Sequence, residues 1–251
     1  MQKEEQLLQN RLIELSQITF HRDIVTYSDF LNLNELNILH TLPKNQLFSQ
    51  YETFGGYAYA ERQMVAFLPD ALYCEIKYPV SILKISPLNP RYSEELTHRD
   101  YLGAILNLGI ERNKLGDIQV MENEAFIFLQ DTLCDFVGKE LTRIRHTSIK
   151  VTRQDKGDFD YQPKYEERKG TVASVRLDSL LSLAFGASRS KLVGLIEAGK
   201  VYVNGRIITT NSYQLKADDV ISVRGLGKFQ YIGEQSVTKK NRIYVTIHKY
   251  I

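Results

Sequence analysis

The sequence has only two cysteines among its 251 residues, Cys74 and Cys134, and they lie 60 positions apart. Neither belongs to a C-x-x-C pair, and no cluster of histidines lies near them. This scarcity excludes a zinc site of the usual spacing and favours a reducing compartment. The histidines are also too scattered to hold a metal ion; they are His21, His40, His98, His146 and His248. We therefore expect neither a metal nor a cofactor.

Long hydrophobic runs are also missing, since no apolar stretch approaches the roughly 18 residues that a membrane-spanning helix needs. The N-terminal stretch MQKEEQLLQNRL is polar and amphipathic and lacks the pattern of a signal peptide. Hydrophobic residues make up 43% and charged residues 25%, as in an ordinary globular protein. We expect a cytoplasmic protein with no membrane partner.

The net charge of +2 conceals an uneven distribution along the chain. Residues 171–251 contain 12 Lys and Arg against 5 Asp and Glu, a balance of +7, so the remainder carries −5. A basic C-terminal third is the electrostatic footprint of a protein that binds a polyanion. Uneven scatter of surface charge is the competing interpretation, so charge alone decides nothing.

The first two segments are predicted as separate α/β domains, over residues 1–76 and 77–153. The first has two helical patterns, over residues 7–15 and 33–42, followed by a hairpin pattern over residues 53–69. In the second, strands are expected over residues 80–85, 117–121, 125–129 and 148–152, and helices over 97–108 and 132–144. Their order, βαββαβ, is that of the ferredoxin-like fold, which RNA-recognition domains share.

Two aromatic residues of the middle segment, Phe126 and Phe128, alternate where RNA-recognition domains place base-stacking rings. The basic and glycine positions of that signature are missing around them, which favours core packing. Residues 154–170 are rich in charge and poor in aliphatic side chains, which predicts a linker.

The C-terminal segment, residues 171–251, predicts a helical hairpin followed by a small antiparallel sheet, so the whole chain is expected to be α+β. A helix over residues 176–185 is closed by Gly186, and Ser188 is placed to cap a second helix. The Asn204-Gly205 pair is a strong signal for a β-hairpin. A further strand is expected over residues 220–223.

The start of the second helix contains a local conflict that points to function. Arg189 and Lys191 lie in its first turn, where the helix dipole disfavours cations by roughly 0.3–1 kcal/mol each. Helix-start amides and two cations together form a binding site for phosphate. The alternative is that both side chains simply extend into water.

The pattern of the C-terminal segment resembles the S4 RNA-binding domain. The matching positions are Arg176, Leu177, Asp178, Gly186, Ser188, Arg189, Ser190, Leu195, Ile196, Gly199, Val201, Val203, Asn204, Gly205, Asp219, Ile221, Val223 and Arg224. Two positions depart from the family: Leu192 replaces a small residue, and Asp218 replaces a glycine.

Three further runs, GGYAYAER (55–62), residues 97–120 and residues 166–182, resemble the YlmH-type S4 proteins. This resemblance implies binding to ribosomal RNA and tRNA on the large ribosomal subunit, in ribosome-associated quality control. His98, Arg99 and Asp100 invite an acid–base interpretation, but Thr97 and Asp100 have the spacing of a capping box. No dinucleotide-binding, Walker or synthetase signature is present.

We therefore expect a non-enzymatic protein whose S4 domain binds structured RNA by its shape. The expected RNA contacts are Arg176, Ser188, Arg189, Ser190, Lys191, Lys200, Asn204, Arg206, Arg224 and Lys228, with secondary contacts at His98, Arg99, Arg112 and Lys114. Asp178 is assigned to structure, as a carboxylate favoured early in a helix. Two alternatives remain: an RNA-modifying enzyme such as a pseudouridine synthase, and a cell-division scaffold tethered to ribosomes.

Overall fold

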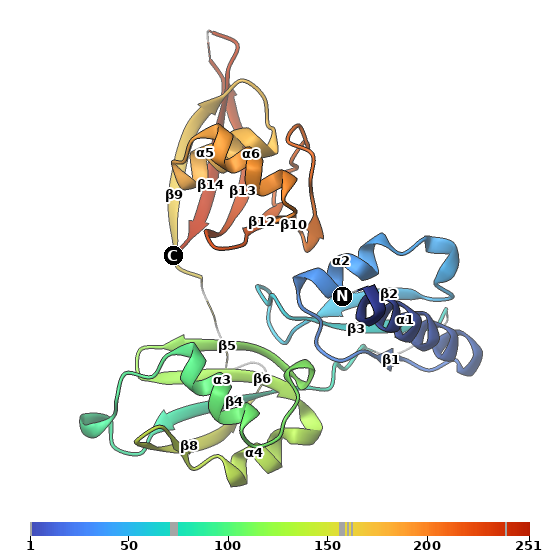
Figure 1. Ribbon diagram of the computed structural model, residues 1–251, viewed down its shortest axis with the longest axis vertical. Coiled ribbons are helices and arrows are strands. Elements are labelled where there is room, and N and C mark those ends of the chain that lie inside the picture. The colour runs from blue at the N-terminus through green and yellow to red at the C-terminus, as the bar shows by residue number, and fades with distance from the viewer. Residues whose placement is uncertain (1, 71–74, 156–158, 160, 162, 239) are drawn as a thin grey trace. The chain divides into compact units, whose positions relative to one another are not determined.

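The computed structural model describes residues 2–70, 75–155, 159, 161, 163–238 and 240–251. These form two compact units, unit 1 (residues 1–161) and unit 2 (residues 162–251), whose elements are labelled in Figure 1. Cys74 lies outside the described residues, whereas Cys134 is a buried thiol.

The N-terminal part of unit 1 packs two helices on a three-stranded antiparallel sheet. The elements are α1 (Gln2–Arg22), β1 (Thr26–Tyr27), α2 (Leu33–Thr41), the 3-10 turn η1 (Lys44–Gln46), β2 (Gln50–Phe54) and β3 (Met64–Leu68), with strand order β1-β3-β2. Both expected helices and the hairpin are confirmed. Asn32 begins α2 with a capping box, because it accepts from the amide of Glu35 while its own amide donates to the Glu35 carboxylate.

The middle part of unit 1 has the expected ferredoxin-like topology. Its elements are β4 (Val80–Pro87), α3 (His98–Leu106), β5 (Leu115–Met121), β6 (Glu124–Gln130), α4 (Cys134–Glu140), β7 (Arg143–Ile144) and β8 (Thr147–Gln154), with strand order β5-β6-β4-β8-β7. α4 is shorter than the helix predicted over residues 132–144, because β7 follows it and turns back at Arg145, where φ is +51°. Leucine and isoleucine side chains of this sheet pack against α3 and α4.

The other face of this sheet is covered by the N-terminal part. Val80, Ile82 and Phe128 share a core with Phe30 and Met64. The sequence predicts separate domains on either side of residue 76, whereas the structure places both segments in unit 1.

The GGYAYAER run explains this union, because its backbone and Tyr57 bind one carboxylate on β5. Oδ2 of Asp117 accepts from the Tyr57 hydroxyl (2.8 Å) and from the Glu61 amide (2.7 Å), and Oδ1 accepts from the Arg62 amide (3.1 Å). The Arg62 guanidinium donates to the carbonyl oxygens of Leu115 and Phe30. Burial, and then the Asp117 carboxylate, raise the pKa of Tyr57, so its hydroxyl remains a donor.

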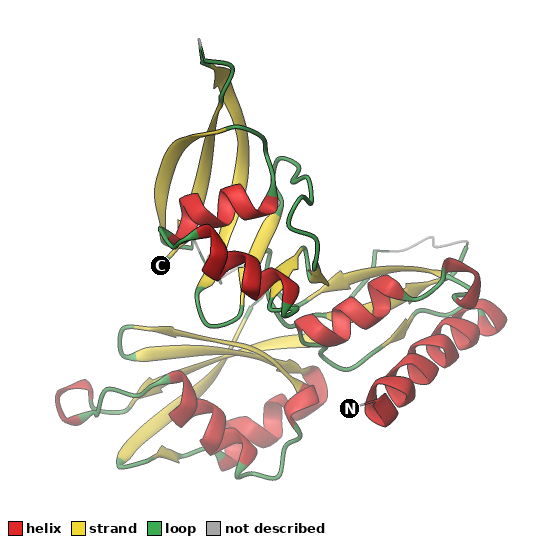
Figure 2. Cartoon of the chain, turned by 45° about the horizontal axis from the view of Figure 1, so that its top comes forward, coloured by secondary structure: helices red, strands yellow, loops and turns green. Residues whose placement is uncertain are grey.

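Unit 2 is a six-stranded antiparallel sheet with two helices on one face (Figure 2). Its elements are β9 (Tyr165–Val172), α5 (Leu177–Phe185), α6 (Arg189–Glu197), β10 (Val201–Val203), β11 (Arg206–Ile207), β12 (Val220–Val223), β13 (Gly227–Val237) and β14 (Ile243–Tyr250), with strand order β11-β10-β12-β13-β14-β9.

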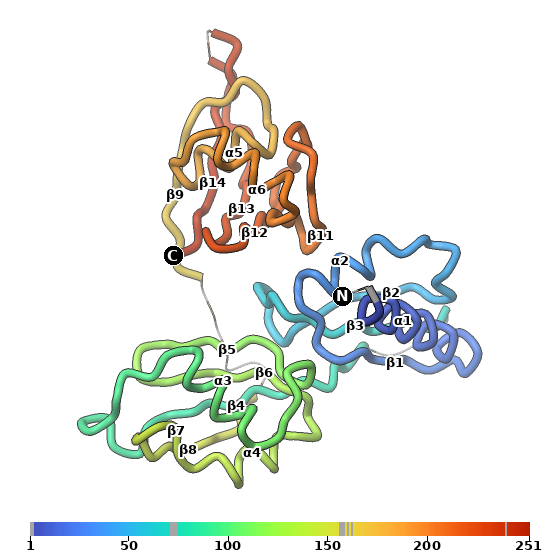
Figure 3. Tube along the Cα trace, viewed as in Figure 1, coloured from blue at the N-terminus to red at the C-terminus, as the bar shows by residue number. Residues whose placement is uncertain are grey.

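The segment expected to be a linker, residues 154–170, contains most of β9. This strand pairs with β14 over its whole length, and Figure 3 shows the two running side by side. β9 is an edge strand, and charged side chains are common on edge strands because they discourage pairing with other chains. Its charge-rich composition therefore has a structural reason that a linker prediction does not capture.

Candidate nucleic-acid interface

The helical hairpin of unit 2 forms because both helices bury an apolar stripe against the same sheet face. Leu177, Leu180 and Leu181 of α5 and Leu192 and Ile196 of α6 are fully buried in one core. α5 ends at Gly186, whose φ of +61° is the left-handed conformation that the sequence predicts there. Three residues separate the end of α5 from the start of α6, and the side chain of the first residue of α6, Arg189, reaches back to Ser179 in the first turn of α5.

One buried carboxylate holds two arginines at this junction. The Asp178 side chain is 9% exposed, and its Oδ1 lies 3.3 Å from Nε of Arg176. Its Oδ2 lies 3.9 Å from Nε of Arg189, whose Nη2 donates to Oγ of Ser179 at 2.8 Å. The guanidinium-bearing side chains remain 39% and 62% exposed. Asp178 thus orients two cations from different segments toward one surface, a role that its position early in a helix did not reveal.

The start of α6 adds backbone donors to this surface. Ser188 occupies the N-cap position as expected, but among the described residues its hydroxyl caps no amide of the helix. That hydroxyl lies 3.3 Å from the Ser190 hydroxyl instead. Ser188, Arg189, Ser190 and Lys191 are all exposed. Helix-start amides, hydroxyls and cations converge here in the arrangement that binds phosphate oxygens.

The other predicted contacts of unit 2 are not all on this surface. Asn204, at φ +48°, donates to Oδ1 of Asp219 (2.8 Å) and accepts from the Val220 amide (2.9 Å), so its side chain fixes the turn between β10 and β11. Arg224 and Lys228 contact residues of the sheet face opposite the helices, Tyr202 and Tyr250. They therefore do not extend the helical surface, although the sequence led us to expect that they would.

Lys200 and Arg206 are exposed at the ends of β10 and β11. The Lys200 carbonyl accepts from the Arg224 amide at 2.9 Å, which ties the two turns together. The departure at Asp218 also has a clear consequence: its φ is +68°, a conformation in which glycine is strain-free. Leu192, the second departure, belongs to the core between the helices and the sheet.

The four secondary contacts predicted in unit 1 divide into two pairs. Arg112 donates to the carbonyl oxygens of Leu115 and Gly116, and Lys114 lies 2.6 Å from Asp29, so both stabilise the fold. His98 and Arg99 are exposed in the first turn of α3.

The expected capping role of Thr97 and Asp100 is confirmed at the start of α3. Oδ2 of Asp100 accepts from the amide (2.9 Å) and the hydroxyl (2.7 Å) of Thr97. Partial desolvation by neighbouring protein atoms, and then the nearby Arg112 guanidinium, lower the pKa of His98.

The aromatic pair on β6 is used for packing. Phe128 is fully buried and stacks on Tyr57 with ring centroids 4.8 Å apart. Phe126 is partly buried, and the centre of its ring lies 5.0 Å from that of Phe159. The Lys84 ammonium lies 5.8 Å from the centre of the Phe126 ring. The sheet face that RNA-recognition domains use for base stacking is therefore occupied at Phe128 by the protein itself.

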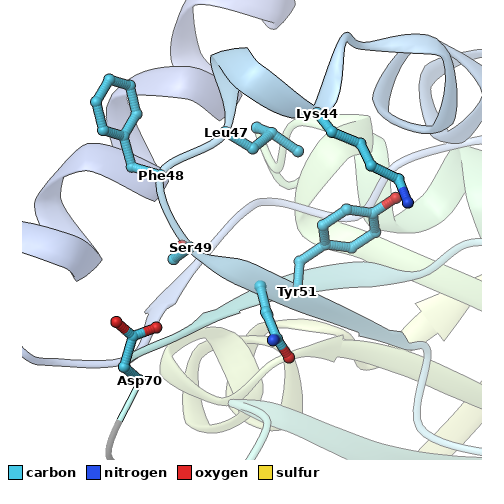
Figure 4. A pocket seen from close by; sticks show the side chains of 7 residues that line it. Lys44, Leu47, Phe48, Ser49, Tyr51 and Asp70 are labelled. Atoms are coloured by element: carbon cyan, nitrogen blue, oxygen red, sulfur yellow. The ribbon is translucent and has the colours of Figure 1, made fainter.

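A cleft of about 640 Å³ lies in the N-terminal part of unit 1, along η1 and β2. Figure 4 shows Lys44 and Asp70 at opposite ends of it, with the aromatic rings of Phe48 and Tyr51 along its wall. The single cation and single carboxylate lie apart, so they do not form an acid–base pair. Across the described ranges, no three His, Cys, Asp or Glu side chains are placed to hold a metal ion, and no helix has the length and apolar character to span a bilayer.

Comparison with known families agrees with this organisation. The family described as "Putative RNA-binding domain in YlmH" matches residues 74–158, and the S4 domain family matches residues 175–221. The small ribosomal subunit protein uS4A of Clostridium novyi is 41% identical over 90 residues, which cover 31% of this chain and 44% of that protein. The chain therefore spans less than half of this ribosomal relative.

Two relatives match more of the chain. The "Ribosome-associated protein quality control protein P2" of Bacillus subtilis is 28% identical over 251 residues, which cover 98% of this chain and 96% of that protein. A solved structure, "Cell division protein ylmH from Streptococcus pneumoniae", matches with a TM-score of 0.51 at 23% identity, covering 62% of this chain and 93% of that one, and it supports the fold. Both domain families match in the same order and one relative matches nearly end to end, so the chain is similar over almost its whole length to the YlmH-type S4-domain RNA-binding proteins.

Proposed function

We propose that this protein binds structured ribosomal RNA and tRNA on the large ribosomal subunit, and that it acts in the cytoplasm in ribosome-associated quality control without catalysing a reaction. Similarity to the YlmH-type S4 proteins and the name of the Bacillus subtilis relative support this proposal. The helical hairpin of unit 2 is the proposed RNA-binding surface, with Arg176, Ser188, Arg189, Ser190 and Lys191 as its contacts.

The observation that carries the proposal is the pair of arginines oriented by Asp178 beside the start of α6. A buried carboxylate that holds both guanidinium groups reduces the side-chain entropy that they lose on binding. Arginine donates in a planar fork that matches phosphate oxygens, and the helix dipole favours an anion at the same place. Such contacts recognise the backbone shape of folded RNA rather than its sequence.

The test is charge reversal at Arg189, the more exposed of the two arginines. Arg189→Glu should weaken binding to purified large ribosomal subunits by about 10-fold or more, because a charge-assisted hydrogen bond contributes roughly 1.5–3 kcal/mol. Lys240→Glu, in an exposed turn between β13 and β14, makes the same change in net charge and is the matched control. Equal affinities of the Arg189→Glu variant and the native protein would exclude the helical hairpin as the binding surface.

Two further measurements separate this proposal from its alternatives. Crosslinking in cells followed by sequencing of the attached RNA should recover large-subunit RNA and tRNA. Incubation of the purified protein with ribosomal RNA should leave every nucleotide unmodified. New base chemistry at any position would instead support an RNA-modifying enzyme.

A further inference from the structure

The sheet of unit 2 has a second face, on the side opposite α5 and α6. Side chains alternate between the two faces of a strand, and Val201, Val203, Ile221 and Val223 point into the core beneath the helices. Tyr202 and Ser222, which lie between these valines and isoleucine, therefore point to the opposite face. Within the described part of unit 2, both helices lie on the core side (Figure 2).

A row of aromatic and polar side chains crosses five strands on this second face. Tyr202 on β10 pairs with Ser222 on β12, and Ser222 pairs with Lys228 on β13. Tyr250 on β14 pairs with Tyr165 on β9. Lys228 joins the two halves, because its Nζ lies 5.3 Å from the centre of the Tyr250 ring. We call these five residues the tyrosine row.

Contacts within the protein hold the rings of the tyrosine row in place. The Arg224 guanidinium lies 6.0 Å from the centre of the Tyr202 ring and donates to its hydroxyl at 3.2 Å. The Tyr165 ring stacks on His248 with centroids 3.9 Å apart and planes 12° apart. Tyr165 nevertheless remains 48% exposed, and Lys228 and Tyr250 are partly exposed.

We propose that the tyrosine row binds single-stranded RNA, with bases stacked on Tyr165 and Tyr250 and phosphates bound by Lys228 and Arg224. Proteins bind single strands by combining aromatic rings, on which bases stack, with cations that follow the backbone. The tyrosine row has this composition and carries no acidic residue. A carboxylate on this face, Glu167, is paired with Lys169 at 2.7 Å and lies 3.9 Å from Nε2 of His248.

The S4 family match does not assign this surface. The match ends at residue 221, before β13 and β14, and it begins after β9. Three of the five residues therefore lie on strands outside the residues that the S4 family matches. The inference rests on the proposed RNA-binding function and gives the protein two RNA surfaces of different specificity, the helical hairpin for folded RNA and the tyrosine row for an unpaired segment.

The test uses the full-length protein and an oligouridylate of about 12 nucleotides, a length within the range that single-strand binding domains cover. Tyr165→Leu and Tyr250→Leu should each lower the affinity by about 5-fold or more, because stacking contributes at least that factor per base. Tyr165→Phe and Tyr250→Phe keep the rings and should stay within about twofold of the native protein. Lys228→Glu, which leaves every ring in place, should also weaken binding.

A second probe separates this inference from the proposed function. The Arg189→Glu variant should bind an RNA hairpin more weakly, whereas the two leucine variants should bind it as the native protein does. For the oligouridylate, the leucine variants should bind more weakly and Arg189→Glu should keep the native affinity. Photocrosslinking of a 5-iodouridine oligonucleotide should label the peptides that contain Tyr165 or Tyr250. If the hairpin binds but the oligouridylate does not, or if the leucine and phenylalanine variants bind it equally, the tyrosine row is not an RNA surface.

Discussion

Replacement of Asp178 by Asn sets two effects on RNA affinity against each other. The substitution keeps the shape of the side chain but removes the charge that lies 3.3 and 3.9 Å from the two arginines. Both guanidinium groups then lose their ion pair with Asp178 and become more mobile, although Arg189 keeps its hydrogen bond to Ser179, and a bound state must order them. Ordering a long side chain costs about 0.5–1.5 kcal/mol, so two of them cost roughly 1–3 kcal/mol.

The opposing effect is electrostatic, since Asp178 also repels a phosphate bound by the same arginines. An arginine between the two anions separates them by roughly 7 Å. Because the Asp178 carboxylate is buried, the repulsion at that distance is about 2.4 kcal/mol at an effective dielectric constant of about 20, and physiological salt reduces it to about 1 kcal/mol. The ordering cost of two arginines, about 2 kcal/mol at the middle of its range, is larger. Asp178→Asn should therefore weaken the binding of an RNA hairpin by about 5-fold, although it makes the protein more positive.

Fluorescence anisotropy of a labelled RNA hairpin over a series of salt concentrations measures the affinity and its dependence on salt. The slope of log K against log salt should stay the same, because the number of phosphate contacts does not change. Asp218→Asn removes the same charge in an exposed turn of unit 2 and is the matched control. Binding of the Asp178→Asn variant that equals or exceeds that of the native protein would refute orientation of the arginines as the source of affinity. The fold should persist, because ion pairs of such exposed arginines contribute less than about 1 kcal/mol each.

Three other predictions concern stability. Asp218→Gly should raise the midpoint of urea unfolding and Asp218→Ala should lower it, because φ at this position is +68° and only glycine adopts that value without strain. Asp117→Asn should destabilise unit 1 by about 2–4 kcal/mol in urea, since the amide cannot replace all three accepted hydrogen bonds; Asp135→Asn, on the exposed surface of α4, should not. The pKa of His98 is lowered from 6.5 in the folded protein. As the pH falls below 6.5, the unfolded chain therefore binds a proton at His98 more readily than the folded protein does, and stability is lost. His98→Gln should therefore show a smaller fall in Tm than the native protein between about pH 8 and about pH 5.

The local features of the fold could be predicted from the sequence, because they depend on neighbouring residues. The left-handed Gly186, the Asn204-Gly205 turn and the Thr97–Asp100 pair all lie where their spacing places them. The same holds for the βαββαβ order, since each strand and helix has its own periodicity.

The contacts that join distant segments could not be predicted. Tyr57 and Asp117 are 60 positions apart, and neither residue type is unusual in its segment. The division of the basic residues of unit 2 between two faces depends on strand pairing, which places Lys228 beside Tyr250. The identity of the arginines was visible in the sequence, but the carboxylate that orients them was assigned only to the helix dipole.

The burial of Phe128, Val80 and Ile82 under the N-terminal segment bears on how the protein can be divided. A fragment cut at residues 74–158, the borders of the matched family, would expose these three side chains to water and would lose Tyr57 and Arg62, which close the junction. The borders that sequence comparison draws thus mark a segment of shared ancestry, whereas the compact unit to which these contacts belong runs from residue 1 to residue 161.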